Sequence, residues 1–231
     1  MGVALRNLEQ RARTYSRAAA DHIRDLCENS VVPINDTADV GRNSVTASYW
    51  EETDQALKRL TANALRNDLI VVGRLKQTQG LPSHALEHLI KRSSRPMLVA
   101  ASGSPRELTG TAIVFWDGSQ SATRAVEGAK PLLTKAKRVV VTRVLDRRKP
   151  DETALIEIVR KFADSDIKAE PLPIPAEGRD LAVRLAAAAD ECKADLVVMG
   201  AYGRGMVREL LFGSRTEALL RSADRPILLA H

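Results

Sequence analysis

Two short segments of this 231-residue chain occur twice, and the two repeats are separated by almost the same distance. Residues 68–73 read DLIVVG and residues 195–200 read DLVVMG, 127 positions later. Residues 95–100 read RPMLVA and residues 225–230 read RPILLA, 130 positions later. Each segment holds an apolar run of the length of a short buried strand. Two matched strands at a nearly constant offset indicate a duplicated domain, so we expect one fold to be built twice.

The second half of the chain alternates between strand and helix patterns. Strands are expected at 111–116, 138–145, 167–174, 196–199 and 227–230, with helices at 121–133, 151–163, 179–192 and from 214 onwards. Such alternation with short loops predicts a parallel sheet covered by helices on both faces. Prolines at 171, 173 and 175 confine the third strand to an edge, and right-handed crossovers then favour the order 3-2-1-4-5. The fold class is therefore α/β, a Rossmann-like open sheet of five parallel strands.

The first half carries only part of this pattern. Its expected elements are helices at 3–28 and 54–67 and strands at 45–50, 69–72 and 97–100. The first strand of the second half begins 84 residues before Asp195, whereas only 67 residues precede Asp68. We therefore expect residues 1–101 to form an incomplete copy that lacks the first strand, its helix and the second strand. A Ser-, Gly- and Pro-containing linker then leads to a complete domain at residues 110–231.

Glycines follow the apolar strand at 196–199 in a defined spacing. Gly200, Gly203 and Gly213, with Ser214 directly after the last, form the pattern G-x2-G-x9-G-S. Glycine lets a backbone approach a ligand closely, and a helix that begins at Ser214 offers its free amides to an anion. The pattern predicts a phosphate cradle; the alternative is that these residues serve only as turn and helix-cap residues.

This stretch resembles the ATP-binding branch of the universal stress protein family, whose signature is G-x2-G-x9-G followed by Ser or Thr. The resemblance covers residues 110–231 and includes the first strand with its Asp-Gly-Ser turn at 117–119. It implies that ATP is the ligand and that Mg²⁺ is carried by the phosphates. The implied phosphate-binding residues are Gly200, Gly203, Gly213, Ser214, Arg215 and Thr216.

The resemblance also implies two contacts with the nucleoside. Asp117 follows an apolar strand, where an unpaired carboxylate is costly, and in the family this residue lies against the nucleoside. An N-cap of the helix expected from Ser121 is the alternative role for Asp117. Val144, at the end of the second strand, corresponds to a position whose main chain meets adenine.

The function implied by the resemblance is that of an ATP-binding universal stress protein, a nucleotide sensor or regulatory module in stress response. The alternative is a weak ATP hydrolase or a phosphoryl- or nucleotidyl-transfer enzyme, which rests on analogy of fold alone. No Walker lysine follows the glycines and no Ser-His-Asp order is visible in the sequence. We therefore expect no catalytic residue and no metal held by protein side chains.

The first copy has a broken glycine pattern. Gly73 matches Gly200, but Lys76 stands at the position of Gly203, and Ser83 stands at that of Gly213. This half is expected to have lost nucleotide binding and to serve as a structural partner. Tandem members of the family join their domains through the closing strands, so we expect these two strands to pair antiparallel as an intramolecular pseudo-dimer. Whether whole chains also form a homodimer stays open.

The composition of the chain narrows the range of possible binding partners further. The 35 basic and 29 acidic residues give a formal charge of +6 without a basic block, and aromatic residues make up 3% of the chain. This composition does not favour nucleic-acid binding, which needs a basic face and stacking platforms. No apolar run has the length of a membrane helix and no signal pattern is present, so we expect a cytoplasmic protein. Cys27 and Cys192 are expected to be unpaired thiols.

Overall fold

The computed structural model describes residues 2–34, 45–50, 56–73, 83–101, 107–145, 152–175, 181–201 and 225–231. Two compact units make up the chain, Met1–Ala56 and Leu57–His231. Among the described residues, no helix is both long enough and apolar enough to cross a membrane.

The smaller unit contains the helix α1 (Gly2–Asn29), which matches the helix predicted at 3–28. The prediction of a strand at 45–50 is wrong, because this segment forms only an isolated parallel bridge, from Ala47 to Ile34. A strand needs a neighbour along its length, and a single bridge does not supply one. The hydroxyl of Tyr49 donates to the carbonyl oxygen of Ser16 at 3.4 Å and so ties this segment to α1.

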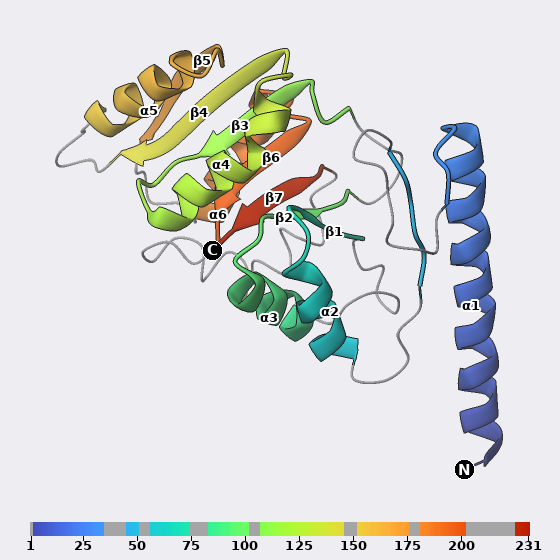
Figure 1. The fold of residues 1–231 in the computed structure, drawn as a ribbon. Helices are drawn as coiled ribbons and strands as arrows, with labels where there is room; N and C mark the ends of the chain where they lie inside the picture. Colours follow the sequence, from blue (N-terminus) through green and yellow to red (C-terminus); the bar gives the residue numbers. More distant parts are fainter. Residues whose placement is uncertain are drawn as a thin grey trace. The chain divides into compact units, whose positions relative to one another are not determined.

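A seven-stranded sheet forms the centre of the larger unit (Figure 1). Its strands are β1 (Ile70–Val72), β2 (Met97–Val99), β3 (Thr111–Phe115), β4 (Arg138–Leu145), β5 (Ala169–Pro175), β6 (Leu196–Gly200) and β7 (Ile227–Ala230). They lie in the order β1-β2-β7-β6-β3-β4-β5. From β5 inwards, the strands of the second half follow the predicted order 3-2-1-4-5, and β2 and β1 extend the sheet beyond the predicted five strands. The proline-containing β5 lies at the edge, as predicted.

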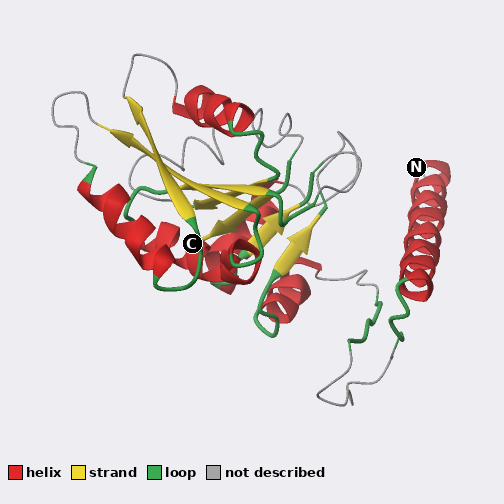
Figure 2. Cartoon of the chain, turned by 90° about the horizontal axis from the view of Figure 1, so that it is seen from above, coloured by secondary structure: helices red, strands yellow, loops and turns green. Residues whose placement is uncertain are grey.

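Helices cover both faces of this sheet (Figure 2). The helices are α2 (Ala56–Ala64), α3 (Ser83–Ser93), α4 (Gln120–Leu133), α5 (Thr153–Ala163) and α6 (Leu181–Glu191). On one face, α4 and α5 pack with residues such as Ala125 and Phe162 against Val114 and Val198. On the other face, α2, α3 and α6 supply Ala64, Ile90 and Leu185. The helix α4, which follows β3, and the helix α6, which leads into β6, therefore lie on opposite faces of the sheet. This is the arrangement that opens a crevice between these two strands.

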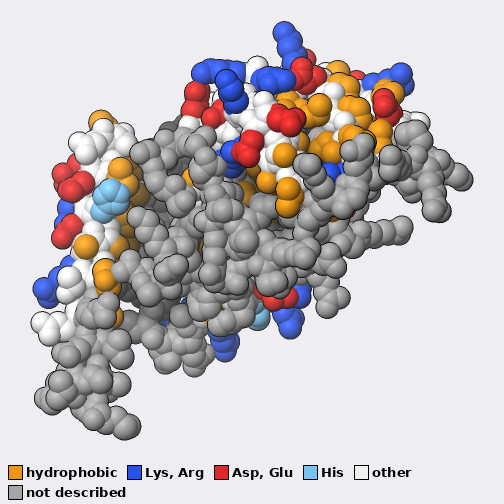
Figure 3. Space-filling view, turned by 180° about the vertical axis from the view of Figure 1, so that it is seen from behind, with side chains coloured by type: hydrophobic (Ala, Val, Ile, Leu, Met, Phe, Trp, Pro, Cys, Tyr) orange, Lys and Arg blue, Asp and Glu red, His pale blue; other side chains and the backbone are white. Residues whose placement is uncertain are grey.

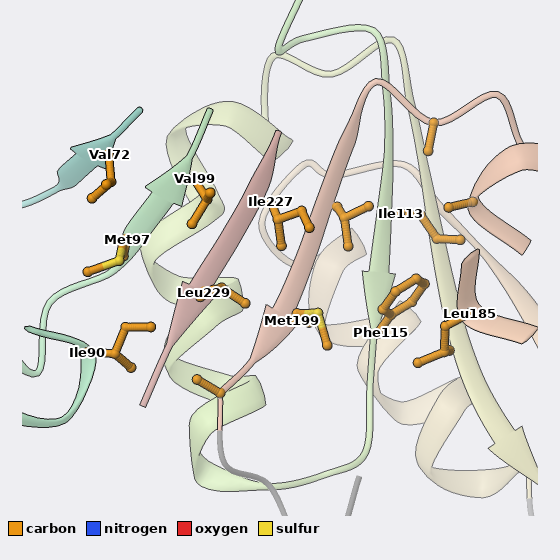
Figure 4. Packing of buried hydrophobic residues seen from close by; sticks show 14 of the residues in the cluster. Val72, Ile90, Met97, Val99, Ile113, Phe115, Leu185, Met199, Ile227 and Leu229 are labelled. Carbon is orange, nitrogen blue, oxygen red and sulfur yellow. The ribbon is translucent and has the colours of Figure 1, made fainter. Parts of the chain in front are cut away.

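The two halves share one hydrophobic core. Side chains of β1 and β2 lie in the same buried cluster as those of β7, β6 and β3 (Figure 4). Residues 57–101 and 110–231 accordingly belong to one compact unit. The division into copies 1–101 and 110–231 stays a prediction about the duplication.

The closing strands join the halves as predicted. β2 and β7 pair antiparallel, with Leu98 opposite Leu228, while the other strand pairs of the sheet are parallel. A second contact lies beside this pairing, because a Cβ atom built on Gly128 in α4 would lie 2.6 Å from the Cβ atom of Pro96. Glycine at position 128 thus lets a helix of the second half approach the first half closely.

Candidate functional site

The candidate site lies at the carboxyl ends of three neighbouring parallel strands. β3 pairs with β6 on one side and with β4 on the other. Gly200 is the last residue of β6, Asp117 follows the end of β3 by two residues, and Val144 lies one residue before the end of β4. The fold therefore brings these three predicted residues to one edge of the sheet. The other predicted site residues, Gly203, Gly213, Ser214, Arg215 and Thr216, lie outside the described residues.

Asp117 shapes the turn between β3 and α4. Its Oδ1 accepts a hydrogen bond from the backbone N–H of Ser119 at 2.9 Å, and Gly118 between them has φ +77. The N-cap of α4 is Ser119, whose hydroxyl accepts from the N–H of Ala122 at 3.1 Å. The alternative role of Asp117 as the N-cap is thus taken by Ser119. The Asp117 side chain is half-buried, and its Oδ2 has no hydrogen-bond partner among the described residues.

The side chain of Val144 packs against the hydrophobic core, and its main chain lies beyond the end of the β3–β4 ladder. The ladder between β3 and β4 ends where Phe115 pairs with Thr142, and the N–H of Trp116 donates to the carbonyl oxygen of Thr142 at 2.8 Å. Main-chain groups in a strand alternate in direction with a period of two residues. The N–H and C=O of Val144 therefore point to the same side as those of Thr142, beyond the end of the ladder. These two groups can form hydrogen bonds with the edge of a planar ligand that lies at the turn beginning at Asp117.

Gly200 has a structural role that the sequence did not reveal. A Cβ atom at this position would lie 2.5 Å from the backbone N of Ala122 and 2.7 Å from the backbone C of Ser121. The close approach is therefore to the first turn of α4. Glycine at position 200 lets the end of β6 and the first turn of α4 lie close together beside the candidate site.

Replacing Gly200 by alanine is expected to destabilise the protein by about 1–3 kcal/mol, because the added methyl group meets backbone atoms that a side-chain rotation cannot move. Urea denaturation followed by circular dichroism measures this change. The matched control is Gly73→Ala at the repeated position, where an added Cβ atom would have no described atom within 4 Å. Equal stability of the two variants would contradict the packing role of Gly200.

Basic side chains border the site without forming one patch. A Cβ atom built on Gly118 would lie 3.8 Å from Nη1 of Arg143, so this guanidinium lies beside the turn. Nη1 of Arg124 donates to the carbonyl oxygen of His231 at 2.7 Å. Sequence patterns gave no signal for either arginine. On the face seen in Figure 3, Lys and Arg side chains lie beside Asp and Glu side chains.

The environment of His231 keeps this imidazole neutral near pH 7. Burial lowers its pKa from the ordinary value, and the positive charges of Arg124 and Lys91 lower the pKa further. Both effects favour the neutral form of the His231 imidazole. The two cysteines, Cys27 and Cys192, are buried free thiols, as expected, and burial raises the pKa of Cys192.

Comparison with known proteins gives the family. The model of the universal stress protein family matches residues 110–231. The chain therefore belongs to the universal stress protein family, as the resemblance of the glycine pattern implied.

Individual relatives agree with this assignment. A universal stress protein from Synechocystis sp. is 26% identical over 170 residues, which make up 70% of this chain and 57% of the relative. The chain thus spans little more than half the length of that protein. The crystal structure of a universal stress protein from Archaeoglobus fulgidus is similar with a TM-score of 0.57 and 18% identity, over 81% of this chain and 67% of the other.

A protein of unknown function from Pseudomonas aeruginosa is similar with a TM-score of 0.53 and 16% identity, over 94% of this chain and 77% of the other. At these identities, the two structural likenesses establish the fold.

Proposed function

We propose that this chain is an ATP-binding universal stress protein that acts as a nucleotide sensor or regulatory module in stress response. The observation that supports the proposal best is the meeting of Asp117, the outward main chain of Val144 and Gly200 at the carboxyl ends of neighbouring parallel strands. Ligands of open α/β sheets bind at this point, where the crossovers change face. The G-x2-G-x9-G-S pattern begins at Gly200.

Each part of the site has a role in this proposal. The Oδ2 atom of Asp117 accepts a hydrogen bond from a ribose hydroxyl, while Oδ1 holds the turn. The main-chain N–H and C=O of Val144 bind the edge of adenine. The glycine-rich segment, Ser214, Arg215 and Thr216 bind the phosphates through backbone amides, hydroxyls and one guanidinium.

Mg²⁺ is carried by the nucleotide in this proposal. Within the part of the chain that the structure describes, no group of three or more His, Cys, Asp and Glu side chains lies together to hold a metal ion. Mg²⁺ that is bound to a nucleotide keeps several waters and needs few protein ligands. The phosphates therefore supply the direct ligands of the metal, and binding of ATP rather than its turnover is the activity proposed here.

The Asp117→Ala variant tests the nucleoside contact. Loss of one hydrogen bond to a charged acceptor is expected to weaken binding of ATP roughly 10- to 100-fold. Isothermal titration calorimetry with Mg-ATP measures this effect, and thermal denaturation without nucleotide shows whether the variant is folded. The matched control is Glu127→Ala, an exposed carboxylate on α4.

Unchanged ATP affinity in Asp117→Ala would contradict the assignment of this residue. Incubation of the parent chain with Mg-ATP provides a second measurement, in which release of phosphate is followed over many turnovers. Steady turnover would contradict a role limited to sensing.

A further inference from the structure

The repeated strand has different neighbours in the two halves. In the second half, β6 lies between β7 and β3. Its counterpart β1 is the last strand of the sheet (Figure 1), and among the described residues of the unit Leu57–His231 it pairs with β2 alone. The comparison of β6 with β1 shows which features of β6 recur in β1, beside which the described sheet has no counterpart of β3.

Two apolar side chains, one in β1 and one just before it, are exposed where their counterparts are buried. Leu196 and Val198 of β6 are both 0% exposed, because they lie in the cluster that α4 covers. The repeat aligns them with Leu69, which is 38% exposed, and Val71, which is 63% exposed. The sheet face of β1 thus keeps the side chains that a helix in the position of α4 would cover.

The aspartate that forms hydrogen bonds just before β6 also has a counterpart just before β1. In the second half, Oδ2 of Asp195 accepts from the backbone N–H of Thr111 at 2.8 Å, and the N–H of Asp195 donates to the carbonyl oxygen of Thr111 at 2.7 Å. This pair of bonds fixes the start of β3 against β6. The repeat aligns Asp195 with Asp68, whose side chain is fully exposed and has its nearest described cation, Arg95, at 3.9 Å.

The glycine at the end of β6 also has a counterpart after β1. Gly200 leaves room for the first turn of α4, whose backbone would lie 2.5 Å from a Cβ atom placed on this glycine. Gly73 stands at the same place in the repeat, yet a Cβ atom placed there would have no described atom within 4 Å. The segment 68–73, which contains β1, thus carries the features with which the segment 195–200 contacts β3 and α4.

We propose that the outer edge of β1 is a docking surface for a strand-turn-helix segment of a partner protein. The strand lies parallel to β1 and donates its first backbone N–H to Asp68. The helix that follows covers Leu69 and Val71 with small apolar side chains, as Ala125 and Ala129 of α4 pack in the second half. The partner segment therefore has the chemistry of residues 111–133 of this chain: an apolar strand, a glycine-containing turn and an alanine-lined helix.

A second copy that pairs β1 with β1 fits these observations less well. Antiparallel pairing of two such edges would satisfy backbone groups, as edge strands commonly do. It would bring no helix onto the face that holds Leu69 and Val71, and it would give no use to the space beside Gly73. The retained features match a strand that continues into a helix.

A peptide with residues 109–134 of this chain provides the probe, because it contains the strand, the turn and the helix that dock onto β6. The peptide carries a fluorescent label, and its anisotropy is measured during titration with the full chain. We expect saturable binding that weakens at least tenfold in the Val71→Lys variant and several-fold in Asp68→Ala. The matched control is Val183→Lys, which places the same charge at an exposed valine of α6 and is expected to leave binding unchanged.

The helix is tested separately with a peptide in which Ala125 and Ala129 are both replaced by glutamate. This peptide is expected to lose binding, whereas an unchanged affinity would show that the helix does not dock. Circular dichroism establishes that Val71→Lys is folded, so that loss of binding reports on the edge.

Absence of saturable binding to the parent chain, or equal binding by Val71→Lys, would overturn the proposal. Analytical ultracentrifugation of the chain alone tests whether a second copy of the chain occupies the edge of β1 instead. A concentration-dependent dimer that Val71→Lys abolishes would assign the edge to a second copy and would also overturn the proposal.

Discussion

Lysine at both Leu98 and Leu228 is expected to abolish the folded state of residues 57–231 under conditions in which the parent chain is folded. These leucines are 6% and 0% exposed and lie opposite each other where β2 pairs with β7. The double variant places two like charges side by side among the buried apolar side chains of this cluster. Each buried, unpaired charge costs several kcal/mol, and a typical domain has a total stability of only about 5–15 kcal/mol.

Circular dichroism and limited proteolysis measure this effect. The parent chain is expected to resist digestion, and the double variant is expected to be cleaved throughout the larger unit. The control is Ile156→Lys, which introduces lysine at an exposed apolar position of α5. Unchanged protease resistance in the double variant would contradict the antiparallel joining of the two halves.

The Gly213→Val variant is expected to lose measurable ATP binding, with an affinity at least about 100-fold lower than that of the parent chain. If the proposed phosphate cradle is correct, a branched side chain at position 213 blocks the approach of phosphate oxygens to the backbone, and it removes the conformational freedom that glycine provides. Calorimetric titration with Mg-ATP measures the affinity.

The matched control for Gly213→Val is Gly73→Val, because the first half is expected to bind no nucleotide. Thermal denaturation of both variants separates loss of binding from loss of structure. If Gly213→Val binds ATP as tightly as the parent chain, the phosphate cradle is assigned to the wrong residues.

Much of the fold could be predicted because its causes are local. The apolar run at 196–199 predicts the buried strand β6. The prolines at 171, 173 and 175 predict that β5 lies at an edge of the sheet, and the repeated Arg-Pro segment predicts β7. The strand expected at 45–50 failed because strand formation depends on a neighbour. Ala47 finds a single bridging residue, Ile34, and no ladder forms.

The sheet positions of Asp117, Val144 and Gly200 could be predicted, whereas the local contacts of these residues could not. Asp117 and Gly200 stand at the expected edge of the sheet, since strand ends can be read from the sequence. The N-cap function of Ser119 and the packing of Gly200 against Ala122 depend on how α4 approaches β6, which no local pattern encodes. That the main chain of Val144 has no partner in β3 likewise follows from where the β3–β4 ladder stops, at Thr142.

The most direct test of the central proposal is the number of ATP molecules that one chain binds. Calorimetric titration of the full chain with Mg-ATP is expected to give a stoichiometry of one, since Asp117, Val144 and the complete glycine pattern occur only in the second half. A stoichiometry near two would show that the first half also binds ATP. Absence of saturable binding would contradict the proposed nucleotide site.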